Sequence, residues 1–308
     1  MSLRVIFMGT PEFAVPSLER LVGDGYAPVA VVTAPDRPQG RGRTVRPSAV
    51  KAAAGRLGIE RILQPESVKD PVFATQVAAL EPDVIVVVAF KILPPAVYEA
   101  AKLGAFNLHG SLLPKYRGAA PIHHAVMAGE RKTGVTTFLL KKEVDTGDII
   151  MQREMEIGPD ETTGDVHDRM MHIGADAVVE TVRIIEAGRV SAVRQDDAVA
   201  TPAPKVYRED GEIDWTEPAV RVHNLIRGMS PHPGAFTRHE GKELKLIRSR
   251  MAAGEGRPGE VVEAGERLAV ACGAGAVELT EVQQEGRRRM SAPDFLHGYP
   301  LSEGDVLG

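Results

Sequence analysis

The sequence predicts an α/β protein in which a Rossmann-like sheet of parallel strands is followed by a small β-barrel domain. Over the first two-thirds of the 308 residues, short apolar runs alternate with segments whose apolar residues recur every three or four positions. This alternation is typical of a parallel sheet with helices on both faces. Beyond Trp215 the pattern changes to short strands separated by glycine-rich turns, which indicates a second, all-β domain.

The strands of the first domain are expected where apolar residues are contiguous, at 3–8, 29–33, 62–64, 84–89, 105–109 and 135–140. Helical spacing is present at 14–23, 48–57, 71–80, 121–128 and 163–187. Gly188 is a usual terminator for the last of these helices. The run Val84–Val88 is rich in β-branched residues, as central strands buried on both sides are. The turn Gly9-Thr10-Pro11 lacks the G-x-G-x-x-G pattern, so a nicotinamide cofactor is not supported.

The second domain is expected after an extended linker. Thr201-Pro202-Ala203-Pro204 disfavours helix, because each proline excludes the helical conformation from the residue before it. A short helix near 220–228 is followed by expected strands at 235–237, 244–247, 259–262, 268–271 and 276–282. Short strands in such close succession are typical of a small barrel. We therefore predict a first domain at 1–189, a linker at 190–206 and a second domain at 207–308.

Composition indicates a cytoplasmic protein. Cys272 is the single cysteine, so no internal disulfide can form, which fits a reducing compartment. The longest apolar run, 84–90, is too short to cross a bilayer, and the first ten residues lack the regions of a signal peptide. We expect no membrane partner. The histidines show no spacing specific to zinc, so no metal is expected.

Charge is distributed unevenly along the chain. The net charge is -5, so the chain as a whole does not indicate a nucleic-acid partner. Basic residues nevertheless form two groups, one consisting of Arg37, Arg41, Arg43 and Arg46, and the other of Arg287, Arg288 and Arg289. A charge run is usually a solvated face, but basic patches on an acidic chain favour contact with phosphates.

The run Asn107-Leu108-His109-Gly110-Ser111-Leu112-Leu113-Pro114 carries the most specific chemical signal. Asn107 and His109 are two residues apart at the end of an expected strand, so their side chains lie on the same face. Acyl transfer needs a proton acceptor and a donor to the developing oxyanion, and histidine and asparagine provide these groups. An isolated Asn-x-His pair more often simply closes a strand. The surrounding residues favour the catalytic interpretation.

Those surrounding residues resemble a known family. Asn107 to Gly118, NLHGSLLPKYRG, is similar to the signature of the formyltransferases that use 10-formyltetrahydrofolate. Asp145-Thr146-Gly147-Asp148 resembles a second motif of that family. The opening Met8 to Ala14 and the arginine-bearing Ala34 to Arg43 resemble the branch whose acceptor is initiator methionyl-tRNA. The resemblance is collinear along the chain, as far as the segment Arg289 to Leu296.

The resemblance implies catalytic roles for Asn107, His109 and Asp145. His109 becomes the candidate for proton transfer and Asn107 the donor to the oxyanion. Asp145 is expected to orient and charge-stabilise the imidazole, or to organise a water molecule. Whether His109 or Asp145 is the formal base is left open. Taken alone, Asp-Thr-Gly-Asp is also a plausible turn.

The resemblance also implies where substrates bind. The family holds its folate cosubstrate, 10-formyltetrahydrofolate, with the segment Ser111, Leu112, Leu113 and Pro114. An OB-like C-terminal domain is implied, and the basic loop 34–47 is implied to contact tRNA. The prolines and glycines of this loop are expected to prevent helix or sheet. The expected RNA contacts are Arg37, Arg41, Arg43, Arg46, Lys205, Arg287 and Arg288.

We therefore interpret the chain as an enzyme that formylates the amino group of methionine on initiator methionyl-tRNA, for translation initiation. One alternative is a formyltransferase acting on a sugar nucleotide or purine precursor, which would share the three catalytic residues but would not need the basic loop. Another is a non-catalytic RNA-binding protein on the same scaffold, against which the intact polar site argues. We expect a monomer, although the sequence does not specify the oligomeric state.

Overall fold

The computed structural model describes residues 3–39, 44–299 and 301–308. The chain forms two compact units. The first contains Met1–Gly118, Gly134–Met155 and Asp168–Pro202, and the second contains Ala119–Thr133, Glu156–His167 and Ala203–Gly308. Both units are therefore assembled from segments that are distant in the sequence.

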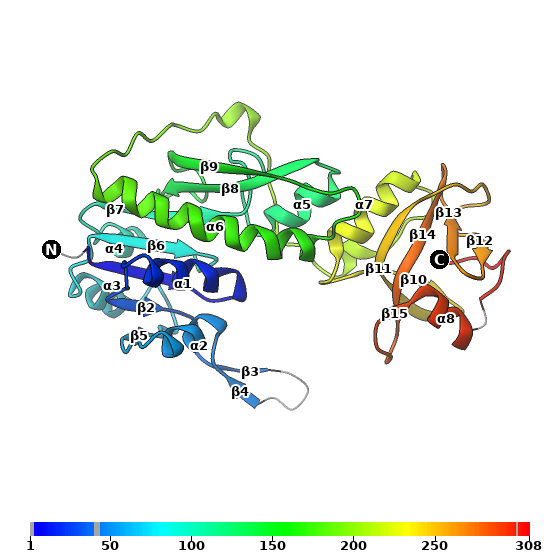
Figure 1. The fold of residues 1–308 in the computed structure, drawn as a ribbon, viewed down its shortest axis with the longest axis horizontal. Helices are drawn as coiled ribbons and strands as arrows, with labels where there is room; N and C mark the ends of the chain where they lie inside the picture. The colour runs from blue at the N-terminus through cyan, green and yellow to red at the C-terminus, as the bar shows by residue number, and fades with distance from the viewer. Residues whose placement is uncertain (1–2, 40–43, 300) are drawn as a thin grey trace. The chain divides into compact units, whose positions relative to one another are not determined.

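The first unit is built on a seven-stranded sheet with the order β5-β2-β1-β6-β7-β8-β9 (Figure 1). Its strands are β1 (Val5–Gly9), β2 (Ala30–Val32), β5 (Ile62–Leu63), β6 (Val84–Val88), β7 (Gly104–His109), β8 (Lys132–Leu139) and β9 (Ile149–Glu156). Neighbouring strands from β5 to β7 run parallel, whereas β8 is antiparallel to β7. The predicted α/β class with a parallel sheet is confirmed.

Helices cover both faces of this sheet, which explains why β1 and β6 are buried along their whole length. The helices of the chain up to residue 186 are α1 (Val15–Gly23), α2 (Ala49–Arg56), α3 (Pro71–Ala78), α4 (Pro95–Tyr98), α5 (Pro121–Met127) and α6 (Thr163–Glu186). On one face Ile85 packs with Phe73 of α3. On the other face α6 approaches β7 so closely that a Cβ at Gly174 would lie 2.7 Å from Leu108 Cδ2.

Local signals in the sequence explain where the helices begin. The Ser48 side chain caps α2 by accepting a hydrogen bond from Lys51 N, and Asp70 caps α3 in front of Pro71. Thr162 and Asp165 exchange reciprocal hydrogen bonds at the start of α6. No helix within the described ranges is long and apolar enough to cross a membrane.

The second unit contains an antiparallel sheet with the order β10-β11-β14-β13-β12, and β15 pairs with β14. Its strands are β10 (Ala235–His239), β11 (Lys242–Ala252), β12 (Val261–Ala264), β13 (Leu268–Ala271), β14 (Ala276–Gln284) and β15 (Met290–Ser291). Trp215, Ile226 and Phe295 belong to its apolar core, and the last two come from α7 (Ala219–Met229) and α8 (Ala292–Gly298). A second domain built on an antiparallel β-sheet is confirmed, and α8 and β15 add elements that the pattern did not predict.

The basic loop departs from its prediction. The strands β3 (Arg37–Gln39) and β4 (Thr44–Arg46) form a two-stranded antiparallel sheet that projects from the first unit (Figure 1). The expectation that prolines and glycines prevent sheet here is wrong. Pro38 lies opposite Val45, and in a two-stranded ribbon both strands are edges, so the missing N–H of a proline can face solvent.

Candidate active site

The end of β7 presents two candidate catalytic side chains on one face of the sheet. Asn107 and His109 are two residues apart in an extended strand and therefore point to the same side. Asn107 is in register with Val87 of β6 and Phe138 of β8. Its amide is half-buried, and among the described residues no hydrogen bond to this side chain is present. The amide N–H groups are therefore available to a substrate.

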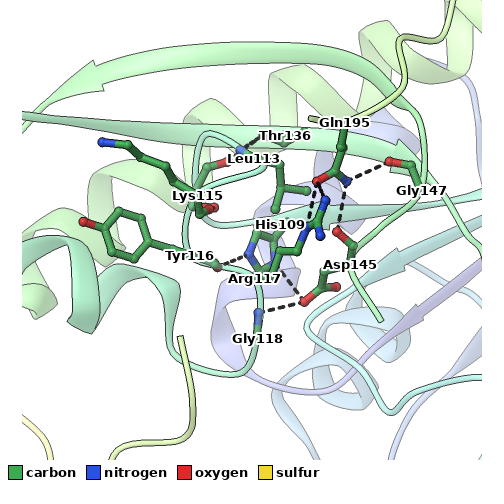
Figure 2. A network of polar contacts seen from close by, with 11 residues as sticks. His109, Leu113, Lys115, Tyr116, Arg117, Gly118, Thr136, Asp145, Gly147 and Gln195 are labelled. Atoms are coloured by element: carbon green, nitrogen blue, oxygen red, sulfur yellow. Dashed lines mark hydrogen bonds and ion pairs between the residues drawn. The ribbon is translucent and has the colours of Figure 1, made fainter. Parts of the chain in front are cut away.

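His109 is held in a defined orientation. The residue is 6% exposed, and its ring lies edge-on to Phe138 with the ring centroids 6.5 Å apart. Nε2 lies 2.8 Å from the carbonyl oxygen of Tyr116, and since a carbonyl can only accept, Nε2 carries the proton. In the neutral imidazole the lone pair is then on Nδ1, which faces Asp145 (Figure 2).

Asp145 lies in the turn between β8 and β9. Its Oδ2 accepts the Gly118 N–H at 2.9 Å and lies 3.9 Å from His109 Nδ1, which is too far for a hydrogen bond. The ring is therefore oriented by the Tyr116 carbonyl, while the carboxylate acts on it through charge. The backbone of Asp145 is left-handed, with φ of 56°, a conformation that aspartate adopts more readily than most residues. This segment is thus a turn that also carries a candidate catalytic side chain.

The turn packs so closely against β8 that position 147 requires a glycine. A Cβ built on Gly147 would lie 1.6 Å from the carbonyl oxygen of Leu139, at the end of β8. No side chain fits in this space without moving the turn away from the strand. The close approach therefore fixes where Asp145 stands relative to the sheet.

The segment Ser111 to Pro114 is tied down by its own neighbours. The Ser111 hydroxyl donates to Lys115 O at 2.6 Å, and the Ser111 carbonyl accepts from Thr136 Oγ1 at 2.7 Å. Leu113 N donates to the same Thr136 oxygen. Ser111 and Leu113 are buried, so Leu112 and Pro114 are the residues of this segment with exposed surface. These hydrogen bonds restrain the loop, as a preformed binding surface requires.

Two further residues form a hydrogen-bond network at the turn that carries Asp145, and neither was predicted from the sequence. Arg117 donates two N–H groups to Gln195 Oε1, and Gln195 Nε2 donates to the carbonyl oxygens of Asp145 and Gly147 (Figure 2). Gln195 lies in the stretch that the sequence indicates as a linker, and nothing in its local pattern marks it. Arg117 lies inside the NLHGSLLPKYRG motif, and this position is the sequence signal that could have identified it.

The expected RNA-binding residues lie on both units. Arg37 and Arg46 are exposed and stand directly opposite each other on the β3–β4 hairpin of the first unit. Arg41 and Arg43 lie outside the described residues. The remaining three, Lys205, Arg287 and Arg288, are exposed in the second unit.

In the part of the chain that the structure describes, no three His, Cys, Asp or Glu side chains are grouped in a way that would hold a metal ion. The candidate catalytic groups of the site are Asn107, His109 and Asp145. Together they offer a donor for an oxyanion, a proton acceptor and a nearby negative charge, which are the groups that transfer of an acyl group between nitrogens requires.

Comparison with known proteins agrees with this chemistry. The profile of the family described as "Formyl transferase" matches residues 3–182, and that of "Formyl transferase, C-terminal domain" matches residues 205–300. The chain belongs to the formyl transferase family, and the resemblance found in its motifs is confirmed.

Individual relatives are similar over nearly the full length. The chain is 46% identical over 308 residues to the methionyl-tRNA formyltransferase of Geotalea uraniireducens, covering 99% of this chain and 98% of the relative. It is 49% identical over 305 residues to the methionyl-tRNA formyltransferase of Chlorobium luteolum, covering 96% of this chain and 97% of the relative.

Solved structures share the fold. WlaRD, a sugar 3N-formyl transferase crystallised in the presence of dTDP and 5-N-formyl-THF, superposes with a TM-score of 0.69 at 18% identity, covering 94% of this chain and all of that one. A methionyl-tRNA formyltransferase from Clostridium thermocellum superposes with a TM-score of 0.56 at 17% identity, covering 82% of this chain and 95% of that one. At these identities the likeness concerns the fold alone.

Proposed function

We propose that this protein transfers the formyl group of 10-formyltetrahydrofolate to the amino group of methionine on initiator methionyl-tRNA. The observation that carries the proposal is the convergence of Asn107, His109 and Asp145 in a chain whose relatives, 46% and 49% identical, are named methionyl-tRNA formyltransferase. The reaction prepares the tRNA for translation initiation. We assign it to the cytoplasm, which suits a chain with a single cysteine.

The three side chains divide the steps of the reaction. The neutral amine attacks the formyl carbon, and its excess proton passes to His109. The carbonyl oxygen becomes negative in the tetrahedral adduct and accepts an N–H from Asn107, a contact worth about 3 kcal/mol in comparable sites. When the adduct collapses, the bond to N10 of the folate breaks and that nitrogen takes the proton from the imidazolium. Atoms and charge balance without a metal.

We assign the role of base to His109 rather than Asp145. The contact of Nε2 with Tyr116 O leaves Nδ1 with the free lone pair of the neutral ring. Asp145 Oδ2 already accepts the Gly118 N–H, and it lies near enough to Nδ1 to stabilise the imidazolium electrostatically. Asp145 is thereby a charge partner of the base.

We further propose that the folate binds the first part of the chain alone, whereas the tRNA contacts both parts. Residues 1–189 would bind the folate, with the segment Ser111 to Pro114 against the pterin, and residues 207–308 would bind tRNA beyond the linker 190–206. The hydrogen bonds that hold the Ser111 to Pro114 loop in place support the folate assignment, because they preform a binding surface. Arg37 and Arg46 support a tRNA contact by the hairpin, because like charges placed directly opposite on a ribbon repel unless an anion lies between them.

The catalytic assignment is tested by replacing Asn107, His109 and Asp145 singly with Ala. Each change is expected to lower turnover by about 100-fold or more, the scale of a lost oxyanion donor or proton transfer. The assay is formyl transfer from 10-formyltetrahydrofolate to charged initiator tRNA, with thermal unfolding as a check of the fold. His172→Ala, an exposed histidine on α6, is the matched control and should retain full activity. Near-normal turnover of His109→Ala would refute the assignment.

The tRNA assignment is tested with Arg37→Ala combined with Arg46→Ala, and separately with Arg41→Ala combined with Arg43→Ala. Use of tRNA should weaken and its dependence on salt should flatten, because fewer phosphates are neutralised. Calorimetric binding of a folate analogue should not change. Arg61→Ala combined with Arg189→Ala removes the same charge from exposed positions elsewhere and serves as control. A formyltransferase of small molecules would show no selective loss with tRNA.

A further inference from the structure

Gln195 stands at the centre of a polar network that joins three loops of the first unit (Figure 2). Its Nε2 donates to the carbonyl oxygen of Asp145 at 2.9 Å and to that of Gly147 at 2.8 Å. Its Oε1 accepts from Arg117, at 3.0 Å from Nε and 2.8 Å from a terminal nitrogen. Gln195 is 5% exposed, so all four bonds form away from bulk water and none is open to a substrate.

The partners leave one orientation for the Gln195 amide. The carbonyl oxygens of Asp145 and Gly147 can only accept, and the guanidinium of Arg117 can only donate. Reversing the amide would therefore break every bond at once and leave buried polar groups unpaired, which is strongly unfavourable. Arg117 thus holds Gln195 with its N–H groups directed at the turn.

The turn needs this support because of the backbone of Asp145. Asp145 has a left-handed backbone with φ of 56°, a conformation that is unfavourable for a residue with a Cβ, although less so for aspartate than for most. The hydrogen bonds from Gln195 to the carbonyl oxygens of Asp145 and Gly147 restrain the backbone in that conformation. Without them the turn can relax, and the carboxylate of Asp145 then loses its place 3.9 Å from His109 Nδ1.

The same network reaches the other side of the site. Arg117 lies between Tyr116, whose carbonyl orients His109, and Gly118, whose N–H binds Asp145. Fixing the Arg117 side chain on Gln195 therefore restrains the backbone on which both contacts depend.

We propose that Gln195 is a positioning residue for formyl transfer, acting through the backbone of Asp145 and through Arg117 without touching either substrate. This inference rests on the proposed role of Asp145 in the reaction. It predicts that loss of Gln195 impairs the chemical step and leaves substrate binding intact.

The first experiment measures kcat and KM of the full-length Gln195→Met and Gln195→Glu variants. Met keeps the shape and loses all four bonds, whereas Glu keeps an acceptor for Arg117 and loses the donor to the two carbonyls. For both, kcat should fall about 10- to 100-fold, the cost of a small misplacement in an active site. KM for each substrate should change by less than about threefold, because the lost contacts matter in the transition state. A fully active Gln195→Glu, or a change confined to KM, would overturn the proposal.

The second experiment is a double-mutant cycle with Asp145→Ala, followed by single-turnover formyl transfer. If Gln195 acts in part through Asp145, Gln195→Met should have a clearly smaller effect once the carboxylate is absent, and the remainder is the part that Arg117 transmits to His109. An effect that persists in full in the Asp145→Ala background would mean that Gln195 acts elsewhere, and the inference would be wrong. A merely structural residue would also show that persistent loss.

The two proposals fail in different ways. If Asp145→Ala lowers turnover strongly while Gln195→Met leaves it unchanged, the inference is refuted and the proposed function stands. A fully active Asp145→Ala removes the proposed role of Asp145 and the inference with it. Asp197→Asn is the control, since it alters the other, exposed partner of Arg117, 2.8 Å away, and should leave kcat unchanged.

Discussion

At the residue scale, surroundings decide what a reactive group does, and Cys272 is the clearest case. The residue is 4% exposed at the end of β13, and burial raises the pKa of its thiol to about 11, although a backbone hydrogen bond from Val277 opposes the shift. The thiol belongs to the apolar core of the second unit with Trp215 and Val270. Cys272 therefore behaves as a small apolar residue.

This predicts that Cys272 is inert in the folded protein. With a pKa near 11, about one thiol in a thousand is ionised at pH 8, and the thiolate is the reactive species. Reaction with an aromatic disulfide reagent should be at least about 100-fold slower in the native protein than in guanidinium chloride. The absorbance of the released thiolate measures both rates. Native labelling as fast as that of the unfolded chain would contradict the assigned environment.

At the element scale, the turn between β8 and β9 is the part of the fold on which the site depends most. Its position is set by the packing of Gly147 on the carbonyl of Leu139, and its conformation by the contacts of Asp145 and Gln195. Neither strand would hold Asp145 in place by its own hydrogen bonds. The active geometry is therefore a property of the turn and its supports.

Gly147→Ala tests this dependence. The added methyl group has to displace the turn, so we expect turnover to fall about 10-fold or more and stability to fall by about 1–3 kcal/mol. The measurements are the formyl-transfer assay and chemical denaturation. Gly55→Ala is the control, because Gly55 is exposed in α2 with open space around its Cα, and alanine there should be neutral or slightly stabilising. Equal behaviour of the two variants would refute the role of the Gly147 contact.

At the scale of the whole molecule, each unit is held together by contacts between distant parts of the sequence. In the second unit α5 packs on α7 so closely that a Cβ at Gly228 would lie 2.2 Å from Met127 Cγ. His223 of α7 binds the carbonyl of Pro159 through Nε2, at 2.9 Å, and Ser249 of β11 through Nδ1. One helix thus connects three segments of the unit.

His223 makes the stability of the second unit depend on pH. Burial lowers the pKa of His223 below its usual 6.5, and the charge of Arg227 acts in the same direction, whereas the Pro159 hydrogen bond and the Asp160 carboxylate oppose it. The unfolded chain therefore takes up the proton first as pH falls through 6.5, so the free energy of unfolding decreases between about pH 7 and pH 5. Above pH 7 this contribution is constant.

The measurement is denaturant unfolding of the wild type and His223→Gln at several pH values between 5 and 8. The wild type should lose more stability on acidification than the variant, with His123, whose pKa burial also lowers, supplying part of the remainder in both. Stability curves that fall in parallel would show that His223 does not carry the dependence.

Elements with a strong local pattern could be predicted, and those without one could not. β1 and β6 are continuous apolar runs, and α6 has helical spacing ended by Gly188, so their positions followed from the sequence. β9 was not predicted, because four of its eight residues are polar or charged and its apolar run, Ile149 to Met151, is only three residues long. The β3–β4 hairpin was missed because proline and arginine are weak strand formers, and pairing between the two strands overrides that preference.

By itself, the sequence determined the family, the α/β sheet followed by a β domain, and the identity of Asn107, His109 and Asp145 as candidates, because periodicity and motif spacing are local properties of a chain. The tertiary structure decided that His109 presents Nδ1, that Asp145 stands 3.9 Å from it, and that Gln195 belongs to the site. Gln195 and Asp145 are 50 residues apart, and a contact at that separation leaves no trace in either local pattern. Such contacts form when the packed sheet brings loops together, because burial in the folded chain requires each polar group to find a partner.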